Sequence, residues 1–380
     1  MAAPDLSDRE FWISNDSVVL ANPRDREALN EAGVIEQWLE GQTGLTAHVL
    51  FRTSGSTGQG KWVALAKDAL LASARAVNEF LGVTPEDRWL QALPLFHVGG
   101  MGIAARAHAA GCRAIEGGGQ WDAARCHEQL MVENITLTSL VPTQLKDLVR
   151  LNLPAPPSLR AVLIGGGKLD DELYRQAMQL GWPVRETYGM TETASQVATA
   201  RAGERCLSIL PCWQVQTDDS GRIQISGEPL LSAYVGINDE GECFLEDPKE
   251  NGWLKSNDLG CVSGNHLEIQ GRVDRCVKIL GELINLTDVE ESVSEAFTEA
   301  NGEHADFAVM ALEDERAGHK LILCIEGEGG FDDVLDSHHA ECHPLHRIAQ
   351  VVYLTSFPHT AIGKIAYSKL QEGLAAVISK

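Results

Sequence analysis

The 380-residue sequence has no hydrophobic run of membrane-spanning length, and its first residues, Met1 to Ser17, carry charges of both signs without an apolar segment. These absences predict neither a transmembrane helix nor a signal peptide. Basic residues are also scarce, because 31 Lys and Arg stand against 54 Asp and Glu, for a formal net charge of −23. A chain with this balance and no local basic cluster repels polyphosphate backbones, so we expect no nucleic-acid partner. Because no run reaches membrane-spanning length, we expect no membrane partner either.

The sequence also lacks CxxC pairs, since its nine cysteines are scattered. An odd, dispersed set of cysteines in a chain of this size is typical of reduced thiols and predicts a cytoplasmic protein. One cluster combines metal-binding residue types, but its spacing fits no closed tetrahedral pattern and argues against a metal site: His338, His339, Cys342, His343 and His346. Nothing in the sequence indicates an oligomeric state.

With 44% hydrophobic residues, the chain is able to bury a core, and its length favours two or three structural units. Short apolar runs alternate with helical patterns from about Ala47 to Gly189, which predicts a mostly parallel sheet covered by helices. The expected buried strands are Val49 to Phe51, Trp89 to Leu93, Thr136 to Val141 and Ala161 to Ile164. One helix is expected to begin after Asp68, as its N-cap, and to end at Gly82.

The pattern changes further along the chain. Between about Arg205 and Gln270, short alternating strands and turns predict a small β-rich subdomain. Residues 273–380 read as a separate small α+β domain, with a helix from Asp288 to Ala300, two strands and a last helix from Tyr367; the strands are expected at Phe307 to Leu312 and Leu321 to Ile325. The predicted fold class is therefore α/β, with a large N-terminal domain over residues 1–272 and a small C-terminal domain.

A loop rich in glycine and hydroxyl groups follows the first expected strand: Thr53-Ser54-Gly55-Ser56-Thr57-Gly58-Gln59-Gly60-Lys61. Backbone N–H groups and a lysine in such a loop can surround a polyphosphate. Gly55 to Lys61 also satisfies the GxxxxGK part of the Walker A pattern, which leaves a P-loop NTPase as an alternative. A Walker loop needs Ser or Thr after the lysine to hold Mg²⁺, however, and Trp62 cannot do so. An ordinary surface turn is the remaining interpretation.

Further motifs follow in a fixed order. They are Pro94-Leu95-Phe96-His97, Gly165-Gly166-Gly167, Tyr188-Gly189-Met190-Thr191-Glu192, Ser256-Asn257-Asp258, Gly271-Arg272-Val273-Asp274 and Pro358-His359-Thr360-Ala361-Ile362-Gly363-Lys364. From Thr53 to Lys364 the sequence thus resembles the adenylate-forming (AMP-binding) superfamily of acyl-CoA and aryl-CoA synthetases. The resemblance implies an enzyme that uses ATP and Mg²⁺ to adenylate a small carboxylic acid and then transfers the acyl group to coenzyme A. It also implies a C-terminal domain that is mobile about a hinge.

The resemblance implies a role for each motif. In the superfamily the Thr of YGxTE contacts phosphate and its Glu helps to bind Mg²⁺, which assigns these roles to Thr191 and Glu192. The resemblance assigns binding of the ribose to Asp258 and Arg272, and it implies that Lys364 reaches the carboxylate and α-phosphate during adenylation. The remaining expected nucleotide-binding residues are Thr53, Ser54, Gly55, Ser56, Thr57, Gly58, Lys61, Gly165, Gly166, Gly167, Tyr188, Gly189 and Met190. The acyl group is assigned to His97, Thr143, Gly166 and Ser195, coenzyme A to Gly281, and the hinge to Asp274.

Three segments are most similar to the o-succinylbenzoate:CoA ligases, the acyl activators of menaquinone synthesis: PLFHVGG from Pro94, LVPTQL from Leu140 and YGMTETASQ from Tyr188. That substrate carries two carboxylates, so it needs a polar or cationic anchor remote from the reacting centre, and the sequence does not identify one. Another acyl- or aryl-CoA synthetase and an inactive nucleotide-binding module remain as alternatives. Retention of Lys364 and Glu192 argues against the inactive module.

The sequence departs from the superfamily pattern at several places. Gly60 replaces the usual Pro of the loop, Ser256-Asn257 replaces Thr-Gly before the ribose Asp, and Leu286-Thr287-Asp288 replaces Pro-x-Glu after Gly281. Only about fifty residues precede the loop, so we expect a shortened N-terminal subdomain and altered contacts with coenzyme A.

Overall fold

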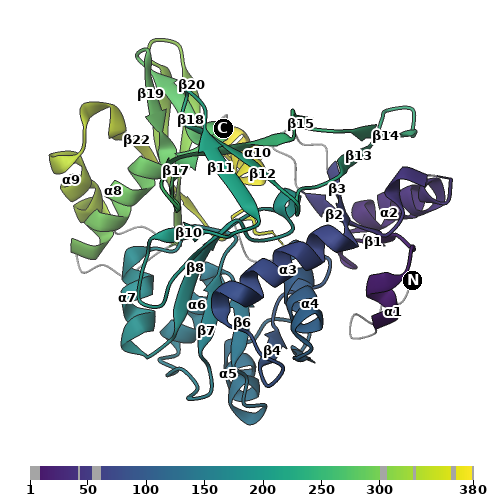
Figure 1. Ribbon diagram of the computed structural model, residues 1–380. Coiled ribbons are helices and arrows are strands. Elements are labelled where there is room, and N and C mark those ends of the chain that lie inside the picture. Colours follow the sequence, from purple (N-terminus) through teal and green to yellow (C-terminus); the bar gives the residue numbers. More distant parts are fainter. Residues whose placement is uncertain are drawn as a thin grey trace.

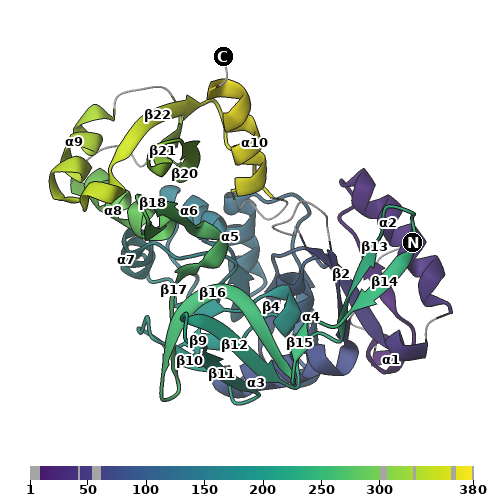
Figure 2. The ribbon, with the colours of Figure 1, turned by 90° about the horizontal axis from the view of Figure 1, so that it is seen from above.

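The computed structural model describes residues 9–41, 43–53, 61–299, 306–327, 331–360 and 365–378. Figure 1 shows a large α/β body and, at the upper left, a smaller unit built from the C-terminal part of the chain. Figure 2 shows the same division from above, with α10 (Tyr367–Ile378) at the right-hand end of the small unit. The predicted fold class is confirmed.

A parallel sheet forms the centre of the large body, in the order β5-β4-β6-β7-β8. Its strands are β4 (Arg88–Gln91), β5 (Arg113–Glu116), β6 (Leu137–Leu140), β7 (Ala161–Ile164) and β8 (Val184–Tyr188). Helices cover both faces: α3 (Lys67–Leu81), α4 (Val98–Ala110), α5 (Ala123–Val132), α6 (Pro142–Arg150) and α7 (Asp171–Gln179). Neighbouring strand residues alternate between the two cores, since Trp89 joins the core of α3 and α4 while Leu90 joins that of α5, α6 and α7.

The strand predicted at Val49 to Phe51 does not belong to this parallel sheet, so that part of the prediction is wrong. It lies in a second, five-stranded sheet, ordered β1-β2-β3-β13-β14. The strands are β1 (Val18–Leu20), β2 (His48–Thr53), β3 (Lys61–Ala66), β13 (Ala233–Ile237) and β14 (Cys243–Glu246), and α2 (Arg26–Leu39) packs on them. The seven residues between β2 and β3 are too few for a parallel crossover, so the two strands pair antiparallel.

The β-rich stretch predicted between Arg205 and Gln270 extends the large sheet beyond β8. Its strands run antiparallel, and β13 and β14 leave it for the five-stranded sheet. The strands that stay are β10 (Leu207–Ile209), β11 (Trp213–Thr217), β12 (Arg222–Gly227), β15 (Lys249–Glu250), β16 (Trp253–Ser263) and β17 (His266–Arg272), and β9 (Ala198–Ala200), which precedes the stretch, joins them to β8. Its status as a subdomain stays a prediction.

The small unit has a three-stranded sheet of β20 (Phe307–Asp314), β21 (Gly318–Glu326) and β22 (Ile348–Leu354) and a hairpin of β18 (Cys276–Ile279) and β19 (Glu282–Asn285). Its helices are α8 (Leu286–Glu299), α9 (Asp332–Glu341) and α10, which begins at Tyr367 as predicted. Helix α8 begins two residues before the predicted Asp288, which lies in the first turn. The domain boundary at 272/273 and the mobility of the unit stay predictions.

The short remaining elements are α1 (Arg9–Ile13), η1 (Thr43–Leu45), η2 (Thr191–Thr193), η3 (Val273–Arg275) and η4 (Pro344–His346). The predicted N-cap of α3 is wrong, because the helix begins at Lys67 and Asp68 lies in its first turn. The buried Lys67 ammonium donates to the Phe11 carbonyl at 2.6 Å, which fixes this residue against α1. The helix does end at Gly82, whose φ of +59° suits glycine.

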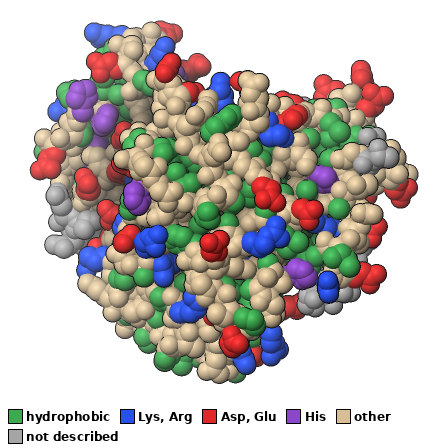
Figure 3. All heavy atoms as spheres, viewed as in Figure 1, with side chains coloured by type: hydrophobic (Ala, Val, Ile, Leu, Met, Phe, Trp, Pro, Cys, Tyr) green, Lys and Arg blue, Asp and Glu red, His purple; other side chains and the backbone are tan. Residues whose placement is uncertain are grey.

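Acidic side chains are prominent on the surface in Figure 3 and gather at the upper right, over the end of the β13–β14 hairpin. The turn of that hairpin carries Asp239, Glu240 and Glu242. No helix in the described part of the chain is long and apolar enough to cross a membrane.

Candidate active site

The loops that follow the carboxyl ends of β4, β6, β7 and β8 carry many of the predicted site residues. His97 follows β4, Thr143 follows β6, the three glycines 165–167 follow β7 and residues 189–195 follow β8. In the sheet order β5-β4-β6-β7, the connection that leaves β4 runs to β5 on one side, while the connection that leaves the neighbouring β6 runs to β7 on the other side. Ligands of open α/β sheets bind at this edge, beside such a switch point.

Glycine is required in these loops by close packing of the chain on itself. A Cβ on Gly165 would lie 2.5 Å from Thr187 Oγ1, and a Cβ on Gly189 would lie 1.6 Å from the Ser195 carbonyl oxygen. Gly166 has a φ of +82°. A Cβ on Gly167 would reach Pro142, the residue before Thr143, at 3.7 Å. The loop after β7 and the start of α6 are thus brought together, as the assignments to nucleotide and acyl group require.

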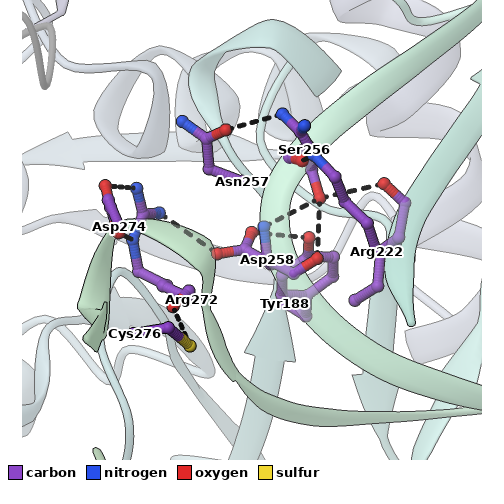
Figure 4. A network of polar contacts seen from close by, with 9 residues as sticks. Tyr188, Arg222, Ser256, Asn257, Asp258, Arg272, Asp274 and Cys276 are labelled. Carbon is purple, nitrogen blue, oxygen red and sulfur yellow. Dashed lines mark hydrogen bonds and ion pairs between the residues drawn. The ribbon is translucent and has the colours of Figure 1, made fainter. Parts of the chain in front are cut away.

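Asp258 on β16 is the centre of the polar network in Figure 4. Its Oδ2 accepts a hydrogen bond from the Tyr188 hydroxyl at 2.8 Å, and its Oδ1 accepts from Arg272 at 3.1 Å. Asp258 is only 9% exposed, and its backbone N–H donates a hydrogen bond to Ser256 Oγ at 3.1 Å. The structure therefore brings together three of the residues predicted to bind the nucleotide, which come from β8, β16 and β17.

Arg272 links this network to the predicted hinge. Its Nε and Nη2 donate to both oxygens of Asp274 at 2.8 and 2.7 Å, while Nη1 reaches Asp258. These bonds to Asp274, followed by the nearby Asp258 charge, raise the pKa of Arg272 despite partial burial. Burial, with the Asp258 carboxylate beside it, raises the pKa of the Tyr188 phenol well above its ordinary value. Tyr188 is therefore a neutral donor and Arg272 a fixed cation at neutral pH.

Lys61 and Glu192 lie on two sides of Tyr234, a residue on β13. The Lys61 ammonium is 5.0 Å from the Tyr234 ring centroid and 2.9 Å from Glu246 Oε2. The Tyr234 hydroxyl donates to Glu192 Oε1 at 2.9 Å. Burial and the Glu192 carboxylate raise the pKa of this phenol, so it remains a donor. The lysine of the phosphate loop and the predicted metal ligand therefore share one neighbour.

Arg106 on α4 is a candidate site residue that the sequence did not reveal. Its guanidinium donates to Ser195 Oγ at 3.1 Å and to Ser139 Oγ at 3.4 Å. The residue is 2% exposed, its Nε has no hydrogen-bond partner, and no carboxylate pairs with it among the described residues. Burial lowers the pKa of Arg106 to about 10, so the group keeps its charge at neutral pH. A cation buried without an anion is costly, which makes it a candidate for binding an anionic ligand.

The other predicted residues lie at the ends of elements or in turns, or outside the described residues. His97 is the N-cap of α4, and its Nδ1 accepts from the Gly99 N–H at 3.1 Å. Gly281 forms the turn between β18 and β19 in the small unit, with a φ of +91°. Thr191 begins η2 and Thr53 ends β2. Ser54, Gly55, Ser56, Thr57, Gly58 and Lys364 lie outside the described residues.

The histidine cluster has ordinary hydrogen-bond partners. His338 is buried between Ser292 Oγ at 3.0 Å and the His346 carbonyl at 3.1 Å, and His339 Nε2 accepts from the Ile348 N–H. Over the described ranges, no three His, Cys, Asp or Glu side chains are grouped closely enough to hold a metal ion.

Comparison with known families decides between the interpretations of the sequence. The model of the AMP-binding enzyme family matches residues 16–254, more than half of the chain. The chain belongs to the AMP-binding enzyme family. This membership confirms the superfamily resemblance and the enzyme class, an AMP-forming acid-thiol ligase, and it removes the P-loop NTPase alternative.

Several AMP-binding enzymes are similar to this protein over most of its length. The 2-succinylbenzoate–CoA ligase of Enterococcus faecalis is 30% identical over 335 residues, which are 83% of this chain and 67% of the relative. The o-succinylbenzoate CoA synthetase of Bacillus subtilis, solved in complex with the acyl-adenylate intermediate OSB-AMP, is 25% identical with a TM-score of 0.72, over 85% of this chain and 68% of that chain. The same enzyme solved with ATP and magnesium ion has a TM-score of 0.74 over 94% of this chain and 79% of that chain. Because the two sequences are only 22% identical, this likeness supports the fold alone.

Proposed function

We propose that the protein is an ATP-dependent 2-succinylbenzoate:CoA ligase of menaquinone biosynthesis, which acts in the cytoplasm. It first forms an acyl-adenylate and pyrophosphate, and then replaces AMP by the thiol of coenzyme A. Adenylation makes the reaction possible because a carboxylate is a poor electrophile, whereas AMP is a leaving group that a thiolate displaces.

The observation that carries the choice of acid is the buried Arg106 guanidinium. 2-Succinylbenzoate has one carboxylate to activate and a second that stays intact, and the second needs a counter-ion inside the pocket. Arg106 supplies a cation that lacks an anionic partner among the described residues and contacts Ser195 in the predicted acyl site. Gly102 leaves space for this contact, since a Cβ there would lie 3.0 Å from Arg106 Nη2 and 3.4 Å from the Ser195 Cβ. A simple benzoate or a fatty acid has no group to pair with this charge.

The residues near the nucleotide motifs fit ATP and Mg²⁺. Asp258 offers a carboxylate for the ribose hydroxyls, and Lys61 offers a cation near the end of the phosphate loop. Glu192 is a half-buried carboxylate with one oxygen held by Tyr234, and Mg²⁺ in ATP sites commonly takes one or two carboxylates together with phosphate oxygens and water. A bound Mg²⁺ would neutralise charge on the phosphates. Trp62, next to Lys61, is buried and donates to Glu31 at 2.9 Å, so it takes no part.

Different residues act in the adenylation step and in the thioester-forming step. Arg106, Ser195 and His97 orient the acid, while Asp258 and Arg272 hold the ribose. Lys364 carries a positive charge to the carboxylate and α-phosphate as the mixed anhydride forms. Gly281 then belongs to the hairpin that admits the pantetheine arm. Asp274, bonded to Arg272, marks the hinge about which the small unit changes its orientation between the steps.

The test of substrate is acid-dependent pyrophosphate release across a panel of acids. We expect 2-succinylbenzoate to support much faster release than benzoate, acetate or a long-chain fatty acid, at equal concentrations of Mg·ATP. Equal rates with benzoate or a fatty acid would remove the assignment of the acid and leave the reaction class intact.

The variant Arg106→Met tests the anchor within the same assay. It removes the charge but keeps an unbranched side chain, so kcat/KM for 2-succinylbenzoate should fall about 10- to 100-fold while KM for ATP stays within about twofold. Because an unpaired buried charge costs free energy, the variant should unfold at the same or a higher temperature than the wild type. Arg113→Met, at an exposed position of β5, is the matched control. A loss of activity together with a lower Tm would mean that Arg106 supports the fold and not the acid.

A further inference from the structure

Tyr234 lies where the two sheets of the large body approach the phosphate-binding motifs. It is on β13, opposite Val63 of β3, two residues from Lys61. The backbone just before β13 contacts η2, because the Leu231 N–H donates to the Glu192 carbonyl oxygen at 2.8 Å. Strand β13 therefore joins β3, the strand that follows the phosphate loop, to the short helix η2 that carries Glu192.

The hydroxyl of Tyr234 fixes one half of the Glu192 carboxylate. It donates to Oε1 at 2.9 Å, and Oε2 accepts no hydrogen bond from any residue that the structure describes. A carboxylate held by one oxygen loses rotational freedom and keeps the other oxygen for a cation. Partners of this kind orient metal-binding side chains and influence metal affinity strongly.

The ring of Tyr234 holds a second charged group. The Lys61 ammonium lies 5.0 Å from the ring centroid, within the range of a cation–π contact, while Glu246 pairs with the same ammonium at 2.9 Å. Both Lys61 and Glu246 are partly exposed, so the ion pair is weak in water and can give way to a phosphate. The ring contact does not compete with a phosphate for charge and keeps the lysine near its place.

We propose that Tyr234 is a positioning residue for Mg·ATP: its hydroxyl orients Glu192 toward the metal, and its ring orients Lys61 toward the phosphates. The inference rests on the proposed function, because it assumes that the metal and phosphates bind at these two side chains. It assigns two separable roles to two parts of one side chain.

The variant Tyr234→Phe separates these roles, since it removes the hydroxyl and keeps the ring. Isothermal titration should show affinity for Mg·ATP weakened about tenfold or more, with affinity for metal-free ATP, measured in EDTA, within about twofold of wild type. Tyr234→Leu removes the ring as well and should weaken binding of both forms of ATP. Tyr353→Phe removes a hydroxyl from β22 of the small unit and should change neither affinity.

A double-mutant cycle with Glu192→Ala shows whether Tyr234 acts through Glu192. Once Glu192 is absent, Tyr234→Phe should cause no further loss of Mg·ATP affinity. An additive loss, or a Tyr234→Phe variant that loses metal-free ATP to the same degree, would overturn the proposal and assign Tyr234 a structural role. Wild-type protein that binds ATP equally with and without Mg²⁺ would instead contradict the metal use in the proposed function, so the two failures are distinguishable.

Discussion

Asp258 is a buried carboxylate that accepts hydrogen bonds at both of its oxygens. Both of its oxygens accept hydrogen bonds, from Tyr188 and from Arg272, and each bond involves a charged group. In Asp258→Asn one oxygen becomes an NH₂ donor that faces another donor, so one of these bonds is lost. We expect the affinity for ATP and AMP to fall roughly tenfold or more, since a hydrogen bond to a charged group contributes about 1.5–3 kcal/mol. Isothermal titration with AMP measures this loss of affinity.

The exposed turn residue Asp219 provides the control for this prediction, because Asp219→Asn removes one negative charge without touching the network. If both variants bind AMP with the wild-type affinity, Asp258 does not hold the ribose.

The sequence predicted Asp258, Arg272 and Glu192 because each stands in a motif with a recognisable order. It did not predict Arg106 or Tyr234, and the reasons are physical. Arg106 is a lone charge in an Ala- and Gly-rich helix, and a lone arginine on a helix is usually on the solvent face. The one indication in the sequence that Arg106 is buried is that helix α4 contains hardly any other polar residue. Tyr234 is an ordinary strand aromatic whose partner Glu192 is 42 positions away, a contact that only tertiary structure creates.

Asp87 is the feature that joins several elements of the large body. It accepts from the Thr84 N–H, from Thr136 Oγ1 and twice from Arg160, whose guanidinium also donates to the Leu81 carbonyl at the end of α3. Although burial opposes it, the bonds from Arg160, Thr84 and Thr136 lower the pKa of Asp87 to about 2 from an ordinary 3.8. The start of β4 is thereby fixed to β6 and α3 by one ionised carboxylate.

The pKa of Asp87 sets a pH-dependent prediction for stability. A lowered pKa in the folded state stabilises the protein above pH 4, and this stabilisation is lost as the pH falls from about 4 toward 2. Asp87→Asn should therefore lower the free energy of unfolding at pH 7 by about 2 kcal/mol, and the difference from wild type should shrink below pH 4. Urea unfolding at several pH values measures this. Asp239→Asn in an exposed turn is the control, and a deficit that stays constant down to pH 2 would contradict the ionic account.

At the level of elements, apolar runs predicted the strands well where the sheet is buried on both faces, as at Ala161–Ile164. They did not reveal which sheet a strand joins. Val49–Phe51 reads like the other buried strands, yet the short connection to β3 forces an antiparallel hairpin. The helix starts at Lys67 and Leu286 were missed because backbone and buried side-chain contacts, rather than the nearby Asp68 and Asp288, decide where these helices begin.

Several side-chain contacts between the large body and the small unit are individually weak. Lys146 pairs with Asp306, Lys168 pairs with Glu291, and Ser294 Oγ donates to Asp170 at 3.3 Å. Most of these side chains are substantially exposed, and exposed ion pairs contribute about 0–1 kcal/mol each. Contacts of this strength are compatible with the change of orientation that alternation between two half-reactions requires, and this mobility stays a prediction.

Alternation predicts that two variants fail in different half-reactions. Lys364→Ala should slow formation of the acyl-adenylate about 10²–10³-fold and still convert supplied adenylate and coenzyme A to thioester. Gly281→Leu should form the adenylate and fail to form the thioester, because its side chain would fill the path of the pantetheine arm. Single-turnover kinetics of each half-reaction measures both effects.

Thermal unfolding of Gly281→Leu has to accompany this experiment, since a φ of +91° strains any residue with a Cβ. With the fold intact, equal damage to both half-reactions in both variants would show that the small unit does not alternate between two orientations. Asp274→Pro at the hinge should trap one orientation, whereas Asp274→Ala should be tolerated.

The most direct test of the central claim is to identify the products of ATP in the presence of 2-succinylbenzoate. Mass spectrometry and ³¹P NMR should detect the acid's adenylate together with pyrophosphate when coenzyme A is left out. Addition of coenzyme A should then convert the adenylate to AMP and the thioester. Acid-dependent release of ADP and orthophosphate, or release of pyrophosphate that does not depend on the acid, would contradict the account.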